Sequence, residues 1–127
     1  MDYTVDIEVR FRDLDPMEHV NNALYVTYLE QARARFYEEV IGVPLAEINT
    51  VLADLQVSYE QAIDGVGSVR VGLRVGELGT SSIPMEYEIR APDGDPRYAT
   101  ASTVQVYFDP ETGDSEPIPD RYRELLS

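Results

Sequence analysis

The chain has 127 residues, 43% of them hydrophobic, and a formal net charge of −14, so we expect one domain with a substantial core. The absence of cysteine excludes disulfides, thiolate nucleophiles and cysteine-ligated metals, and a single histidine excludes a multi-histidine metal centre within one chain. The acidic charge disfavours nucleic acid and anionic membranes as partners, and no apolar run approaches the ~20 residues that span a bilayer.

The N-terminal part of the chain predicts one strand followed by one long helix. Hydrophobic and polar residues alternate over residues 3–11, which is the period of a half-buried strand. From residue 22 to about residue 40 the apolar spacing becomes helical, and Gly42 marks the end. Asn21 or Asn22 is the expected N-cap. We expect this amphipathic helix to lie against a sheet.

The rest of the chain returns to the period of a strand. Four further strands, joined by short turns, are expected at residues 51–59, 69–75, 83–89 and 98–108. We expect the even-numbered residues from Tyr98 to Phe108, and the odd-numbered ones from Val51 to Tyr59, to face the core. The fold class is therefore α+β, a curved five-stranded antiparallel sheet with one long helix against one face. The acidic segment 109–127 is expected to end in a short helix at residues 121–126.

The charge and the N-terminus bear on the cellular setting. All ten basic residues are arginine, and a surface at −14 repels itself at low ionic strength, whereas near 1 M salt the Debye length falls to ~3 Å. We interpret this composition as halophilic, adapted to a salty cytoplasm; the alternative is an ordinary acidic protein from a high-GC genome. Residues 1–10 are acidic and alternating, unlike a signal peptide, so we expect a soluble, cytoplasmic protein.

Polar groups gather where the first strand meets the helix, in the stretch DLDPMEHVNNALY, residues 13–25. A helix N-terminus carries unpaired N–H groups and about half a positive charge, so it can stabilise a developing anion. Asp15 lies just upstream and supplies a candidate base or nucleophile. This carboxylate and the helix N-terminus are two of the parts that acyl transfer needs. A thioester suits such a site, because its thiol has a pKa of ~8.5 and departs as thiolate without a strong acid.

This region also resembles a known family. Residues 10–33, RFRDLDPMEHVNNALYVTYLEQAR, resemble the start of the hotdog-fold acyl-CoA thioesterases of the 4-hydroxybenzoyl-CoA thioesterase family, and the order of elements agrees over about residues 3–108. The resemblance implies a sheet wrapped around one long central helix, with subunits that join their sheets as a homodimer or homotetramer. It implies that Asp15 is the catalytic carboxylate, as nucleophile or as base on water, and that N–H groups near Asn22 polarise the carbonyl.

Comparison with related branches assigns two further candidates. The plant acyl-carrier-protein thioesterases have a histidine that corresponds to His19, but Met17 stands where they have an asparagine. Another branch uses an acid on the long helix, for which Glu30 is the nearest candidate. The related hydratases show D-x-N-P-x-H, and counting five positions from Asp15 reaches Val20, so hydratase activity is disfavoured.

Several other candidates keep more than one interpretation. His19 is structural, lines the cleft or carries a proton, and Tyr25 belongs to the core or to the acyl pocket. Arg90, like Arg70 and Arg74, binds the phosphates of coenzyme A or forms a surface ion pair. Ser81 belongs to a turn that contacts pantetheine or is an ordinary hairpin turn, and no G-x-S-x-G motif supports it as a nucleophile. Asp13 is expected to bond the loop backbone.

We therefore predict a single hotdog thioesterase domain over residues 1–127, with its core at about residues 3–108. The expected reaction hydrolyses an acyl-CoA, the small-molecule partner, to a carboxylic acid and free coenzyme A. No metal or other cofactor is expected beyond the coenzyme A of the substrate. The alternatives are a non-catalytic acyl-CoA-binding hotdog protein and a hotdog enoyl-CoA hydratase.

Overall fold

The structure is a computed structural model that describes residues 1–127. Its strands are β1 (Tyr3–Val9), β2 (Thr50–Tyr59), β3 (Gly67–Val75), β4 (Ser82–Arg90) and β5 (Arg97–Tyr107), and its α-helices are α1 (Asn22–Phe36) and α2 (Asp120–Leu126). Short 3-10 helices lie at Phe11–Asp13 and Leu45–Glu47. The expected five strands, long helix and short C-terminal helix are confirmed.

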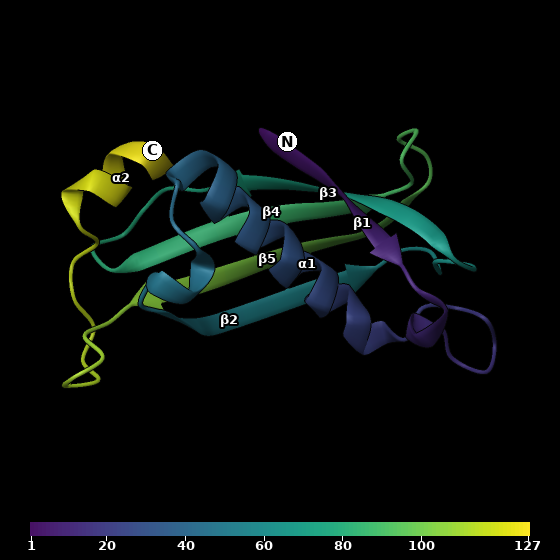
Figure 1. Ribbon diagram of the computed structural model, residues 1–127, viewed down its shortest axis with the longest axis horizontal. Helices are drawn as coiled ribbons and strands as arrows, with labels where there is room; N and C mark the ends of the chain where they lie inside the picture. The colour runs from purple at the N-terminus through teal and green to yellow at the C-terminus, as the bar shows by residue number, and fades with distance from the viewer.

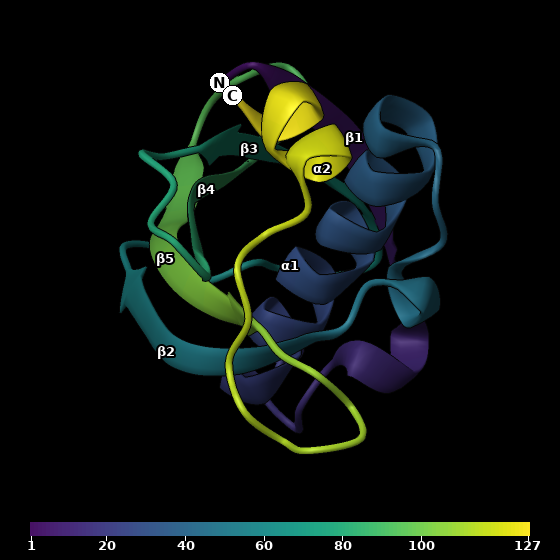
Figure 2. The same ribbon diagram turned by 90° about the vertical axis from the view of Figure 1, so that its left-hand side faces the viewer.

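The five strands form one antiparallel sheet in the order β1-β3-β4-β5-β2. The sheet curves around α1, which runs across its concave face (Figures 1 and 2). This is the predicted hotdog arrangement. β1 and β2 are the edge strands, and each is paired along one side only.

The long helix begins and ends where the sequence signals it. Asn21 is the N-cap, and its side-chain oxygen accepts the N–H of Ala23 at 2.9 Å. After Phe36 the helix continues through a π-helical turn, Tyr37–Ile41, and Gly42 then ends it in the left-handed conformation, with φ of 84°. No helix in the chain is both long enough and apolar enough to cross a membrane.

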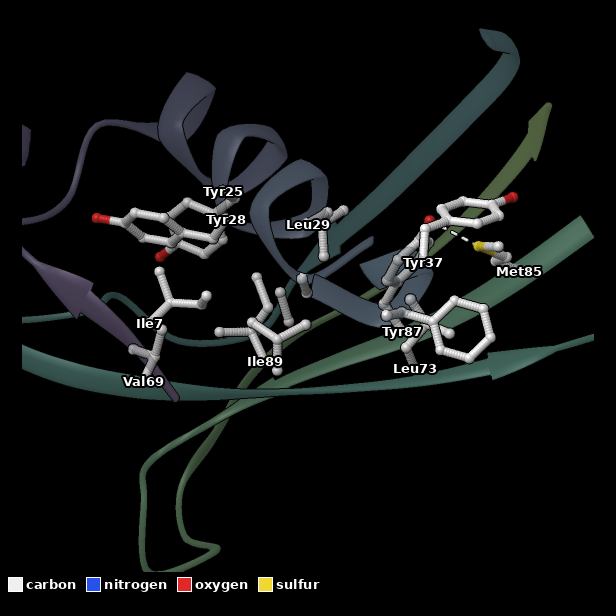
Figure 3. Close-up of a cluster of buried hydrophobic side chains, with 14 of the residues drawn as sticks. Ile7, Tyr25, Tyr28, Leu29, Tyr37, Val69, Leu73, Met85, Tyr87 and Ile89 are labelled. Carbon is white, nitrogen blue, oxygen red and sulfur yellow. Dashed lines mark hydrogen bonds between the residues drawn. The ribbon is translucent and has the colours of Figure 1, made fainter. Parts of the chain in front are cut away.

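The core lies between α1 and the concave face of the sheet. Figure 3 shows Tyr28 and Leu29 of α1 pointing toward Ile7, Val69 and Ile89 of the sheet. The C-terminal segment also enters this core, through three buried residues, Ile118, Tyr122 and Leu126. The core therefore extends beyond the expected boundary at about residue 108.

The structure corrects the expected face of β5. Thr103 and Gln105 are each only 2% exposed, so the odd-numbered residues face the core and the even-numbered ones lie on the opposite face. The prediction was wrong because these inward residues are polar. Thr103 bonds the hydroxyl of Tyr87 at 2.8 Å and Gln105 donates to Thr103 at 3.0 Å, whereas Oε1 of Gln105 is buried without a partner.

The expected face of β2 holds for only part of the strand. A β-bulge shifts the pairing with β5 between Leu52 and Asp54. One extra residue reverses the alternation of side chains, so Leu55 and Val57 share the inner face while Val51 lies on the other. No periodic signal in the sequence marks this bulge.

Candidate active site

The loop between β1 and α1 is tied down by a buried carboxylate. Asp13 is 2% exposed and accepts hydrogen bonds from the main-chain N–H of Arg10 at 3.0 Å and from the hydroxyl of Tyr28 at 2.8 Å. Burial acts to raise the pKa of Asp13, but the hydrogen bonds from Arg10 and Tyr28 outweigh it and lower that pKa. Asp13 therefore fixes the loop, as expected, and is fully engaged in doing so.

Asp15 closes a tight turn in the same loop. Its Oδ1 accepts the main-chain N–H of Met17 at 2.9 Å and that of His19 at 3.2 Å. The turn requires a positive φ of 63° at Glu18. Oδ2 of Asp15 has no partner in the chain, so one carboxylate oxygen is fixed and the other is free to react.

The first N–H of α1 is likewise free. The N–H groups of Ala23 and Leu24 are both bonded by Asn21, whereas that of Asn22 has no acceptor in the chain. The carbonyl of Asn22 accepts the hydroxyl of Tyr59 at 2.9 Å, which holds the end of β2 against the helix. The start of α1 thus offers an unpaired donor at the positive end of the helix dipole.

A pocket of about 280 Å³ brings four predicted site residues together: Asp15, His19, Asn22 and Tyr25. We call it the Asp15 pocket. Tyr25 belongs both to the core, at 2% exposed, and to this lining, so its two interpretations are compatible. The other lining residues are Val20, Tyr59, Glu60, Gln61 and Ala62.

His19 also lines a second pocket, of about 550 Å³, together with other residues of the loop and residues 64–66. Three apolar side chains around it are unusually exposed, Phe11 at 84%, Met17 at 73% and Val66 at 63%. Asp64 lies in the same lining, with Oδ1 2.9 Å from Nε2 of His19. The sequence analysis did not assign Asp64 to the site, because no local signal links it to a histidine 45 residues earlier.

Comparison with known proteins places this geometry in a family. A profile of the Thioesterase-like superfamily matches residues 9–126. The chain belongs to this superfamily. The resemblance inferred from residues 10–33 is therefore confirmed.

Other members of the fold are similar over nearly the whole chain. A thioesterase from Thermus thermophilus, solved with coenzyme A and Zn, is 37% identical, with a TM-score of 0.84, over 97% of this chain and 90% of its own. PA2801 of Pseudomonas aeruginosa, whose thioesterase activity is itself a proposal, is 31% identical, with a TM-score of 0.88, over 98% and 97%. YsmA of Bacillus subtilis (strain 168), an uncharacterized protein, is 25% identical over 94% of this chain and 82% of its own.

Three predicted substrate-binding residues of this chain do not line the Asp15 pocket. Glu30 is exposed on α1, and Ser81 lies beside the β3–β4 turn, at the opposite end of the sheet from the loop (Figure 1). Arg90 is held by Glu88 at 2.9 Å and by the carbonyl of Gly94 at 3.2 Å. A single chain therefore does not gather these three residues with the predicted catalytic group.

The arginines differ in which protein groups their side chains contact. Six pair with carboxylates: Arg10, Arg35, Arg70, Arg74, Arg90 and Arg97. Three others donate to a tyrosine hydroxyl or a main-chain carbonyl: Arg33, Arg121 and Arg123. Arg12 makes neither contact and is exposed on the loop that carries Asp15. It is the one arginine whose side chain has no partner in the chain.

Proposed function

We propose that this chain is an acyl-CoA thioesterase in which Asp15 is the reacting carboxylate and the Asn22 N–H binds the oxyanion. The observation that carries the proposal is the pairing, in one pocket, of a free carboxylate oxygen with a free helix N-terminal N–H. A carbonyl carbon placed between them would meet a base or nucleophile on one side and an electropositive donor on the other.

As a base, Asp15 removes one proton from water while the water oxygen bonds to the carbonyl carbon. The carbonyl oxygen becomes an oxyanion, stabilised by the N–H of Asn22 and the helix dipole. The C–S bond then breaks, and the departing thiolate takes the proton back from Asp15. As a nucleophile, Asp15 would bond to the acyl carbon first and expel the thiolate, and water would hydrolyse the resulting anhydride. Both routes yield one carboxylic acid and free coenzyme A, and neither needs a metal or another cofactor.

Coenzyme A as the thiol is supported by the Thermus thermophilus relative, a thioesterase solved with that molecule. Arg12 offers an uncompensated positive charge on the active-site loop for its phosphates. The strongly negative net charge of −14 disfavours nucleic acid and anionic membranes as partners.

A second copy of the chain would complete the site. The outer edge of β2 is unpaired, and three of its large hydrophobic residues, Val51, Leu52 and Tyr59, are 47–49% exposed. The Asp15 pocket extends along Tyr59 to Ala62, so a subunit docked on β2 would lie beside it. We infer a homodimer, or a homotetramer of such dimers, because unpaired apolar edges favour self-association.

The test is release of thiol from a panel of acyl-CoA substrates at high salt. Asp15→Asn should lower kcat by about 10²–10⁴-fold, since it removes the acting carboxylate. Asp114→Asn, at an exposed acid of the C-terminal segment whose side chain makes no hydrogen bond, is the matched control and should keep normal turnover. Near-normal turnover by Asp15→Asn would reject the assignment.

The same panel separates the two alternatives. A non-catalytic acyl-CoA-binding protein would bind the esters without releasing thiol. A hydratase would add water to an enoyl-CoA and leave the thioester intact. Either result would replace the hydrolase proposal.

A further inference from the structure

His19 and Asp64 form a pair that the main chain holds in place. Nε2 of the imidazole lies 2.9 Å from Oδ1 of Asp64, and the two residues also face each other as an antiparallel β-bridge. Next to the bridge, Val20 donates its N–H to the carbonyl of Ile63 at 2.9 Å. An ordinary surface ion pair depends on two freely moving side chains, whereas here the backbone sets the partners opposite one another.

This contact determines which ring nitrogen of His19 carries hydrogen. A carboxylate oxygen only accepts, so the hydrogen between the two groups belongs to Nε2. In the neutral ring Nδ1 then carries a lone pair and acts as an acceptor. Nδ1 has no partner in the chain, while the main-chain N–H of His19 already donates to Asp15 at 3.2 Å. His19 is thus held by one carboxylate through its backbone and by another through its ring.

We propose that Asp64 is a positioning residue that fixes the ring of His19 so that Nδ1 accepts a hydrogen bond from the attacking water. The inference rests on the proposed function and adds to it a second acceptor on His19, which lines the same pocket as Asp15. A water whose hydrogens are held by two acceptors keeps a lone pair available for the carbonyl carbon, which lowers the cost of orienting it. In this role Asp64 acts through His19 and does not itself hold the attacking water.

A double-mutant cycle tests this dependence. Asp64→Ala, His19→Ala and the double variant are compared in kcat and KM for an acyl-CoA that the wild type hydrolyses. Asp64→Ala should lower kcat by about 10- to 100-fold, the range found where a carboxylate orients a metal-binding histidine, with little change in KM. The double variant should lose no more than His19→Ala alone. Asp64→Asn, which keeps an acceptor oxygen, should recover part of the loss.

The control variant Asp114→Ala removes an exposed carboxylate of the C-terminal segment and should leave kcat unchanged. Thermal unfolding of each variant separates loss of positioning from loss of fold: a purely structural Asp64 would lower the unfolding temperature and kcat together. Because His19 is the only histidine, its two ring nitrogens give one pair of nitrogen NMR signals. These should show hydrogen on Nε2 in the wild type and faster exchange of that hydrogen in Asp64→Ala.

Three results would overturn the inference alone: wild-type kcat in Asp64→Ala, additive losses in the cycle, or hydrogen on Nδ1 in the wild type. A wild type that releases no thiol from any acyl-CoA would instead overturn the proposed function, and the role of Nδ1 as a water acceptor would fall with it. The two failures are therefore distinct.

Discussion

The hydroxyl of Tyr28 donates a hydrogen bond of 2.8 Å to the buried carboxylate of Asp13, which joins the middle of α1 to the loop before it. The main-chain carbonyl of Asp13 accepts the N–H of Asn21, the N-cap, at 3.0 Å. One aspartate thus links the end of β1, the body of α1 and its first turn. The position of Asp15 relative to the helix N-terminus depends on this connection.

Removal of the Tyr28 hydroxyl should therefore weaken both fold and activity. Tyr28→Phe leaves a buried carboxylate with one fewer donor, and we expect the free energy of unfolding to fall by about 1.5–3 kcal/mol. Urea unfolding measures this change. Tyr98→Phe, at a partly buried tyrosine whose hydroxyl has no partner, is the control and should stay close to wild type. Equal effects of the two substitutions would contradict the role of the bond.

Acid should remove the contribution that the hydrogen bond between Tyr28 and Asp13 makes to the free energy of unfolding. Burial acts to raise the pKa of Asp13, but the hydrogen bonds of Arg10 and Tyr28 outweigh it, so that pKa is lowered in the folded state. As the pH falls, Asp13 of the unfolded chain therefore takes up its proton before Asp13 of the folded chain does. The contribution of Asp13 to the free energy of unfolding is present above pH ~3.9, the pKa of an unperturbed aspartate, and is lost as the pH falls through the lowered pKa of the folded state. The stability difference between wild type and Tyr28→Phe should therefore narrow as pH is reduced from 7 to 3. A constant difference would show that the bond does not favour the charged carboxylate.

Arg12 should distinguish the full coenzyme from its truncated form. Arg12→Gln should raise KM about tenfold for an acyl-CoA, equivalent to one charge-assisted hydrogen bond, and leave KM for the acyl-pantetheine thioester unchanged. Arg12→Lys should recover part of the effect. Arg35→Gln, at an arginine that pairs with Glu39 on the opposite end of α1, is the control. A rise in KM for both thioesters would show that Arg12 does not recognise the phosphates.

Salt should stabilise the folded chain. At −14 the folded surface repels itself, and ions screen that repulsion. We expect the midpoint of thermal unfolding to rise between 0.1 M and 2 M KCl. A variant with Glu47, Asp54 and Glu77 replaced by their amides carries three fewer exposed charges and should show a smaller rise. An equal rise in both chains would assign the effect to something other than surface charge.

Sequence reasoning located the parts of the site that are close in sequence. Asp15, His19 and Asn22 lie within eight residues, and a strand period followed by a helix period is enough to place them at a junction. Asp64 was missed, since its contact with His19 depends on the pairing of two distant segments. Thr103 was placed on the wrong face of β5, because a polar residue turned inward reverses the usual pattern.

The three buried side chains of the C-terminal segment, Ile118, Tyr122 and Leu126, set a condition on biosynthesis. The interior cannot close until the ribosome has released those residues, so a nascent chain stopped after β5 would present its uncovered apolar end to chaperones.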